Sequence, residues 1–178
     1  TVRDAGLLRR RKRFYAVTFG VLTTGLVAAW FGFALLHDTW YLLLIAGVLG
    51  VIFTQYAFMA HELAHRQVFE SGKANDVGGR ILASFLVGIS YSWWMTKHTR
   101  HHGNPNTVDK DPDIETDFIV FQHDKATGLT GLSRLLARKQ GYLFFPVLLL
   151  EGVNLHRHAF ITVFSKGKVD KRALEIVL

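Results

Sequence analysis

Two uncharged, apolar runs near the start of the chain limit its fold more than any other feature. They cover residues 14–36 and 41–60, and only the four residues from His37 to Trp40 separate them. A helix of the first run's length is about 34 Å long at 1.5 Å per residue, enough to cross a hydrocarbon core of about 30 Å. This run is also too long for a signal peptide. The sequence therefore predicts a transmembrane helical hairpin over residues 14–60.

The distribution of arginine and lysine orients this hairpin. Six of these residues precede the first run, none lies in the turn at 37–40, and ten lie between residues 61 and 140. Basic residues gather on the cytosolic side of a membrane, so both chain ends of the hairpin are expected in the cytosol. The net charge of +7 then suits lipid headgroups, because the basic residues flank apolar runs, and nucleic acid is not expected as a partner.

Five of the nine histidines form two clusters, and each cluster follows an apolar segment. The first holds His61 and His65, and the second holds His98, His101 and His102. Residues three and four apart share one face of a helix, about 5 to 6 Å from each other. Neutral imidazole binds Zn, Cu, Fe and Ni, and the absence of cysteine excludes a thiolate site. The spacing predicts a metal site where helices leave the membrane, on the cytosolic side.

A zinc-protease motif is an alternative interpretation of the first cluster. His61-Glu62-x-x-His65 matches the pattern in which two histidines bind zinc and the glutamate activates water. A catalytic zinc takes three protein ligands, whereas the two clusters offer five imidazoles, a number that begins to suit two metals. Glu151 does not begin the Glu-x-x-His pattern of soluble di-iron proteins, since Asn154 stands three residues after it.

Between the two clusters, a polar loop containing Gly78 and Gly79 is predicted to precede the apolar residues 81–94. Fourteen apolar residues are too few to cross a membrane comfortably and favour a re-entrant or interfacial helix. After the second cluster, residues 103–124 are polar and rich in turn-forming residues. Their alternating aspartates lack the glycine and the glutamate of a calcium-binding loop, so this region is predicted to be a solvated cytosolic loop.

The chain after residue 125 has two parts. Leucines between 129 and 136 share a face opposite basic residues, which predicts a helix lying on the membrane surface. Residues 141–164 are apolar enough to insert, yet they carry ionisable residues near their middle. Such residues at membrane depth normally face a cavity, a partner or a site. A full membrane span and a short inserted helix that ends near Leu155 both stay open.

A His-x-x-x-His box followed by a His-x-x-His-His box, each after a hydrophobic segment, resembles the membrane fatty acid desaturases. The stretch from His98 through His-His-Gly-Asn-Pro-Asn to Asp111-Pro112-Asp113 is similar to the acyl-CoA and acyl-lipid branch, and the likeness covers roughly residues 14–165. It implies two non-haem irons, O2 as co-substrate and electrons from a small cytochrome, a ferredoxin or a flavoprotein reductase. The product would be a C=C bond in a fatty acyl-CoA or acyl-lipid substrate.

The resemblance also implies roles for particular residues. The five histidines of the two boxes are expected to bind iron, and His156 is a candidate sixth ligand. Glu62 and Glu151 are expected to orient ligand imidazoles, and Asn154 to bind through water. An acyl chain can lie in an apolar tunnel while its head stays at the cytosolic surface. Three basic residues are candidates for contact with an acidic headgroup or a coenzyme A phosphate: Lys97, Arg100 and Lys110.

The sequence is expected to form the N-terminal part of a single all-α integral membrane domain, with a transmembrane helical hairpin, interfacial helices and histidine boxes on the cytosolic side. It starts without methionine and ends within an apolar run, so a longer protein is expected. The third histidine box of the family is missing, and the chain alone is expected to be inactive. The expected parts are a basic cytosolic N-terminus (1–13), the hairpin (14–60), a cytosolic and interfacial histidine-box region (61–140), a membrane-inserted segment (141–165) and a basic segment that begins a further apolar run (166–178).

Three other functions stay open on the sequence alone. A related histidine-box hydroxylase or ketolase would give a product that gains oxygen, whereas a desaturase product loses two hydrogens. A zinc intramembrane metalloprotease would hold one zinc per chain and no iron. A membrane-anchoring module would do no chemistry.

Overall fold

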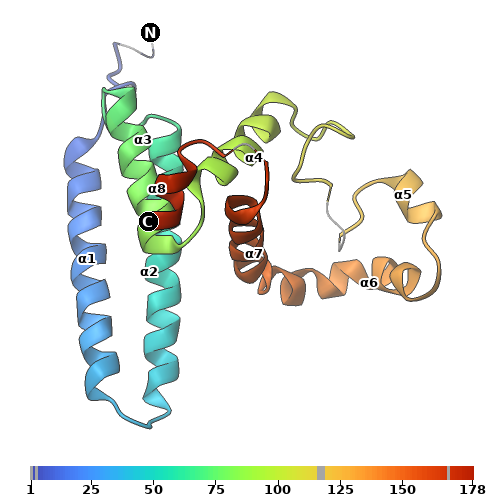
Figure 1. Cartoon of the computed structure of the whole chain (residues 1–178), viewed down its shortest axis with the longest axis horizontal. Coiled ribbons are helices and arrows are strands. Elements are labelled where there is room, and N and C mark those ends of the chain that lie inside the picture. The colour runs from blue at the N-terminus through green and yellow to red at the C-terminus, as the bar shows by residue number, and fades with distance from the viewer. Residues whose placement is uncertain (1, 3, 116–118, 168) are drawn as a thin grey trace. The chain divides into compact units, whose positions relative to one another are not determined.

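The two apolar runs form two long helices that lie side by side and antiparallel (Figure 1). In the computed structural model, α1 (Lys12–Leu35) and α2 (Tyr41–Ala64) each contain 24 residues. The turn between them includes Asp38 in the left-handed region, with a φ of 46°. Both helices are long and apolar enough to cross a membrane. The predicted pair of helices is confirmed, and it indicates membrane association.

The structure describes residues 2, 4–115, 119–167 and 169–178, and within these ranges it contains helices and no strand. The all-α part of the predicted fold class is therefore confirmed. The chain divides into two units, residues 1–91 with 177–178 and residues 92–176.

Close packing between small and aromatic side chains holds α1 and α2 together. Tyr56 of α2 is fully buried, and its hydroxyl lies 2.9 Å from Thr23 Oγ1 of α1. The ring of Phe19 meets that of Tyr56 edge-on, with the centroids 6.0 Å apart. Gly32 permits a close approach, because a Cβ there would lie 3.0 Å from Ile45. The outward faces of both helices stay apolar and exposed.

A helix takes the place of the polar loop predicted after the first cluster. α3 (Gly72–Arg80) packs on α2. The side chain of Ser71 accepts the N–H of Ala74 at 3.3 Å, which is the usual role of an N-cap residue. The loop prediction was wrong because its polar residues and glycines serve packing instead: a Cβ at Gly79 would lie 2.6 Å from the ring of Tyr91.

The apolar stretch that follows α3 does not form the single short helix that was predicted. η1 (Ile81–Val87) is a π-helix that continues from α3 and ends at Gly88, whose φ of 80° is left-handed. Glycine adopts this conformation without the steric cost of a Cβ. The N–H of Tyr91 then donates to Ser84 Oγ at 3.2 Å. The helix therefore ends here, and the second histidine cluster lies on a separate helix, α4 (Tyr91–Gly103).

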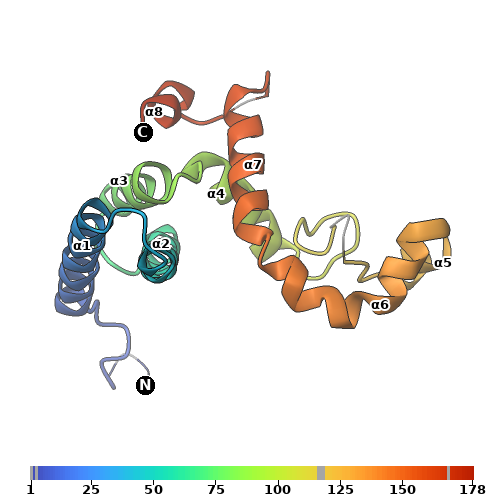
Figure 2. The same cartoon turned by 90° about the horizontal axis from the view of Figure 1, so that it is seen from below.

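The second unit contains most of α4 and the helices after it. Figure 2 shows α6 and α7 joined end to end at a bend, where Leu149 and Leu150 separate the two helices. One of the two alternatives left open for residues 141–164, a short inserted helix that ends near Leu155, is wrong, because α7 continues through this residue. The remaining bounds are α5 (His123–Thr127), α6 (Gly131–Leu148), α7 (Glu151–Phe164) and α8 (Arg172–Val177).

Two polar contacts tie distant parts of the second unit together. The side-chain amide of Gln140 on α6 pairs with the backbone of Val120, accepting its N–H at 2.8 Å and donating to its carbonyl at 3.0 Å. Ser92 Oγ, near the start of α4, lies 2.8 Å from the carbonyl oxygen of Asp170 and 3.0 Å from a carboxylate oxygen of Glu175. These contacts connect α4 to the chain around α8, and the loop after α4 to α6.

Candidate metal centre

The first histidine box forms the last turn of α2. The rings of His61 and His65 lie side by side, with centroids 4.6 Å apart, and the N–H of His65 donates to the carbonyl of His61 at 3.1 Å. Leu63 between them is buried and lies against α3, since a Cβ at Gly78 would be 3.3 Å from its methyl groups. Helical spacing therefore brings the two imidazoles of this box together, as predicted.

The carboxylate of Glu62 is held by the first helix. Tyr15 of α1 donates its hydroxyl to Glu62 Oε2 at 3.0 Å. Nearby, Lys12 forms an exposed ion pair of 2.7 Å with Glu70, and Arg10 donates to the carbonyl of Arg66. The N-terminal end of α1 thus contacts both the last turn of α2 and the chain that follows it. The expected contact between Glu62 and a ligand imidazole stays a prediction.

The second histidine box forms the last turns of α4. The rings of His98 and His102 lie 4.3 Å apart, edge to face, and Trp94 stacks on His98 at 4.3 Å with an interplanar angle of 18°. The ring centroid of His101 is 5.6 Å from that of His102, with an interplanar angle of 77°. Each box therefore presents a close pair of imidazoles, and the second box adds a third imidazole beside its pair.

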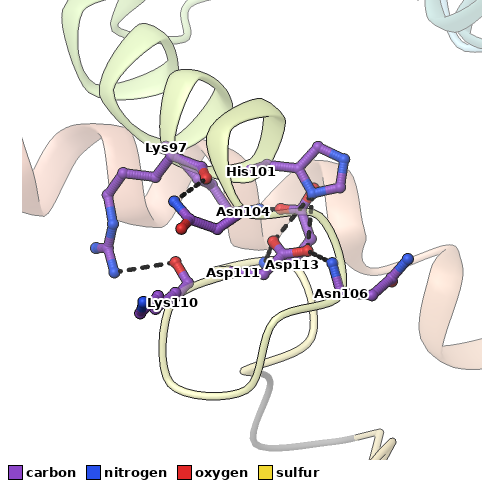
Figure 3. A network of polar contacts seen from close by, with 8 residues as sticks. Lys97, His101, Asn104, Asn106, Lys110, Asp111 and Asp113 are labelled. Carbon is purple, nitrogen blue, oxygen red and sulfur yellow. Dashed lines mark hydrogen bonds and ion pairs between the residues drawn. The ribbon is translucent and has the colours of Figure 1, made fainter.

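A buried carboxylate holds His101 (Figure 3). His101 Nδ1 lies 2.9 Å and 3.0 Å from the two oxygens of Asp111, which has no exposed surface. The backbone N–H groups of Asn106 and Asp113 donate to the same carboxylate at 2.7 Å and 2.9 Å. The prediction that this loop is solvated was wrong for Asp111, because contacts with these residues close the loop over the side chain.

Hydrogen bonds lower the pKa of Asp111 and raise that of His101. Burial raises the pKa of Asp111, but the N–H groups of Asp113 and Asn106 and the ring of His101 outweigh burial and hold this pKa at about 2. The hydrogen bond to Asp111 in turn raises the pKa of His101. Asp111 is therefore ionised at neutral pH, and an ionised carboxylate only accepts hydrogen bonds.

The predicted residues of α7 lie on different sides of that helix. A cavity of about 730 Å³ in the second unit is lined in part by Glu151 and Asn154, and Asn154 Nδ2 donates to Glu151 Oε2 at 3.2 Å. His158 also lines this cavity and stacks on Trp93, with centroids 6.1 Å apart and an interplanar angle of 4°. His156 Nδ1 donates to the carbonyl of Gly152 at 2.7 Å, and the residue is not among those lining the cavity.

The three predicted headgroup residues make contacts within the second unit. Lys97 Nζ forms an ion pair of 2.6 Å with Asp113, and Arg100 donates to the carbonyl of Lys110 at 3.4 Å. Lys97 and Arg100 line the cavity, whereas Lys110 does not. The charge of Lys97 is thus partly balanced within the protein, while Arg100 is exposed.

Sequence reasoning missed Asp111 and the stacked pair of Trp93 and His158. The signal for Asp111 was the Asp111-Pro112-Asp113 stretch at a short distance after the second box, a feature that the sequence alone did not connect to a histidine. His158 lies seven residues after Glu151, two helical turns along α7, and only the folded cavity distinguishes it from His156.

The donor atoms of the two boxes fit iron. All five are imidazole nitrogens, a ligand type that suits iron as well as zinc and copper, and each box brings at least two of them close together on one helix. The acidic residue that contacts His101 is of the type that supports ligand histidines in metal sites.

Comparison with known proteins places the chain among desaturases. The sequence profile of the family "Fatty acid desaturase" matches residues 38–176. The Delta(8)-fatty-acid desaturase of Borago officinalis is 27% identical over 185 residues, covering 97% of this chain and 42% of that protein. The Delta 8-(E)-sphingolipid desaturase of Emericella nidulans is 31% identical over 121 residues, covering 61% of this chain and 22% of that protein.

A Delta(6)-fatty-acid desaturase, fat-3 of Caenorhabditis elegans, is 31% identical over 112 residues, covering 63% of this chain and 24% of that protein. The chain thus spans less than half the length of these curated relatives. No solved structure matches it significantly. The matches give no support to a hydroxylase, a ketolase or a zinc protease. The profile match covers most of the chain, including both histidine boxes, so the chain belongs to the fatty acid desaturase family.

Proposed function

We propose that this protein, in its full length, is an O2-dependent fatty acyl desaturase with two non-haem irons held by its histidine boxes. The observation that carries the proposal is the close imidazole pair within each box, 4.6 Å between His61 and His65 and 4.3 Å between His98 and His102, in a chain of this family. A bound di-iron centre would activate O2, the oxidant for the removal of two hydrogens from an unactivated acyl chain.

The proposal assigns iron binding to the five box histidines and requires the two boxes to face one common volume. His156 is proposed as a sixth ligand, and its contact with the Gly152 carbonyl through Nδ1 is the kind that fixes the tautomer of a ligand histidine. Glu62 and Glu151 are proposed to support ligand side chains, with Asn154 acting through water. Tyr15 and Asn154 already restrict the positions of the Glu62 and Glu151 carboxylates.

The proposed substrate is a fatty acyl chain carried on coenzyme A or on a lipid. The names of the relatives, which include fatty-acid and sphingolipid desaturases, support an acyl chain. We propose that the acyl chain lies in an apolar path and that its headgroup meets Lys97, Arg100 and Lys110. Among these, Arg100 is exposed beside the 730 Å³ cavity, which makes it the strongest candidate for an acidic group.

We further propose that α1 and α2 span the bilayer with both histidine boxes on the cytosolic side. The arginine and lysine distribution supports this orientation, with none of these residues between α1 and α2. Electrons would come from a small cytochrome, a ferredoxin or a flavoprotein reductase. The chain alone is proposed to be inactive, because it lacks a third histidine box.

The test uses the full-length protein in lipid nanodiscs. Metal analysis is expected to give two irons per chain, and product analysis by mass spectrometry is expected to give a loss of two hydrogens from the acyl chain. One zinc per chain with no iron, or a product that gains oxygen, would overturn the proposal. His123→Ala is the matched control, since His123 is exposed and lies outside both boxes.

A further inference from the structure

The loop after α4 is built around one buried side chain. Asp111 has no exposed surface, although most residues from 102 to 110 are exposed. The loop reaches this arrangement through two left-handed residues, Asn106 and Asp109, with φ values of 57° and 61°. A buried carboxylate is costly unless hydrogen bonds compensate its lost hydration, so the contacts of Asp111 are the reason that the loop can close.

The contacts of Asp111 use up its capacity as an acceptor. An ionised carboxylate has about four lone-pair positions. Asn106 donates its N–H to Oδ2, Asp113 donates its N–H to Oδ1, and His101 Nδ1 lies within 3.0 Å of both oxygens. The three donors therefore occupy the acceptor positions of both carboxylate oxygens.

This arrangement argues against a cation bound directly between His101, Asp111 and Asp113. The ligand atoms of these residues lie within 4.8 Å of one another, a spacing that by itself would suit a metal. However, the N–H donors of two backbone groups already point at Asp111, and Asp113 is paired with Lys97 at 2.6 Å. The cluster acts as a set of hydrogen bonds and not as a metal cage.

The same contacts fix the ring of His101. Both oxygens of Asp111 accept backbone N–H groups and lie within 3.0 Å of Nδ1, so the proton of the neutral imidazole is on Nδ1, and Nε2 then carries the lone pair. In Figure 3 the ring edge that bears Nε2 is turned away from both carboxylates. All hydrogen bonds that the described part of the chain makes to this ring end at Nδ1.

We propose that Asp111 is a positioning residue that holds His101 in the Nδ1–H tautomer and so presents Nε2 to the metal. This inference rests on the proposed function, since it takes His101 to be a ligand. Asp113 contributes less to holding the ring of His101. Its Oδ2 is 3.2 Å from the same nitrogen, but its side chain is 41% exposed and also forms an ion pair with Lys97. The polar loop of residues 104–113 thereby orients a histidine of the second box.

The experiment is a double-mutant cycle in the full-length protein, with metal binding measured directly. Asp111→Asn keeps the size of the side chain and removes its charge, and His101→Ala removes the ring. Asp111→Asn is expected to weaken metal affinity about 10- to 100-fold, the usual cost of losing a residue that supports a ligand. Asp109→Asn is the control, because Asp109 lies in the same loop and is exposed, and it is expected to leave affinity unchanged.

The cycle separates a positioning role from a purely structural one. If Asp111 acts through His101, adding Asp111→Asn to His101→Ala costs no further metal affinity, since coupled residues are not additive. An additive loss, or full metal affinity in Asp111→Asn, overturns the proposal. The cycle can be run with whichever metal the protein holds, so a zinc protein would refute the proposed desaturase chemistry while still testing Asp111.

A second measurement needs no variant at Asp111. In metal-free protein labelled with 15N-histidine, the signals of His101 are assigned by their loss in His101→Gln. The expected spectrum has a protonated Nδ1 and an unprotonated Nε2 for the neutral ring. A ring protonated on Nε2 overturns the proposal even if Asp111→Asn does not fold.

Discussion

Both histidine boxes contain a pair of histidines four residues apart, but the two boxes are held in different ways. The first box lies at the end of α2, and apolar packing supports it. Leu63, which stands between the two histidines in the sequence, is buried and contacts α3. The second box lies at the end of α4, and its His101 contacts the carboxylate of Asp111 in a polar loop. The comparison shows that helical periodicity sets which imidazoles can meet, whereas the support of each box comes from whatever surrounds it.

This difference has a physical basis in the two units. In the first unit, apolar helices pack against one another, so van der Waals contact and burial are the main means of fixing a side chain. In the second unit, the chain after α4 is polar and mostly exposed. A polar loop can fix a side chain only through hydrogen bonds, and such bonds are strongest when one partner is charged and shielded from water. Variants in each unit test this contrast.

The largest expected effect is the same for both boxes and comes from removing one histidine of either. His61→Ala and His98→Ala in the full-length protein are each expected to abolish desaturation and to lower iron content, because each removes one imidazole of a close pair. Iron analysis and product mass spectrometry measure the two effects. His37→Ala, in the exposed turn between α1 and α2, serves as the control and should keep both. Full activity in either box variant would show that the two boxes are not equivalent.

The next effect distinguishes the boxes. Leu63→Ala removes a buried side chain beside the first box and is expected to destabilise the protein by about 2–5 kcal/mol, with loss of metal following from loss of packing. Thermal unfolding followed by tryptophan fluorescence measures the effect. Leu44→Ala is the matched control on the same helix, because Leu44 is 67% exposed. Equal melting temperatures for the two variants would contradict the view that apolar packing supports the first box.

The sequence predicted what depends on local periodicity. The two long helices follow from uninterrupted apolar runs, and the paired imidazoles within each box follow from positions four residues apart. α3 was missed because polar residues with two glycines favour a loop, while its Ser71 cap and its packing at Gly79 act only in the folded chain. The break after η1 depends on one left-handed glycine, Gly88.

The burial of Asp111 could not be predicted for a different reason. An aspartate in a polar loop is normally solvated, and this one is buried only because His101 and the N–H of Asn106 meet it there. Those contacts depend on the path of the loop backbone. The choice between His156 and His158 as the histidine that lines the cavity is likewise a property of how α7 packs.

A smaller effect concerns a polar side-chain contact of the first box. Tyr15→Phe removes the hydroxyl that donates to Glu62 at 3.0 Å and is expected to cost about 0.5–1.5 kcal/mol, the usual net value of a hydrogen bond. Iron content should stay close to that of the wild type. Tyr41→Phe, at an exposed tyrosine on α2, is the control in thermal unfolding. An iron loss in Tyr15→Phe as large as in Asp111→Asn would show that both boxes depend on single polar contacts.

The smallest effect is expected at the ion pair between Lys12 and Glu70, whose side chains are 59% and 76% exposed. Exposed pairs contribute little because water screens them, so Lys12→Ala, Glu70→Ala and the double variant should melt within error of one another at neutral pH and physiological salt. At low salt a small coupling is expected. The hydrogen bond and charge of Lys12 lower the pKa of Glu70, so the coupling should be present above the ordinary pKa of glutamate and disappear as the pH falls through the lowered value. A coupling that persists at high salt and neutral pH would mean that the pair holds the start of α1 in a way that screening does not weaken, and that the first unit relies on charge more than its apolar packing implies.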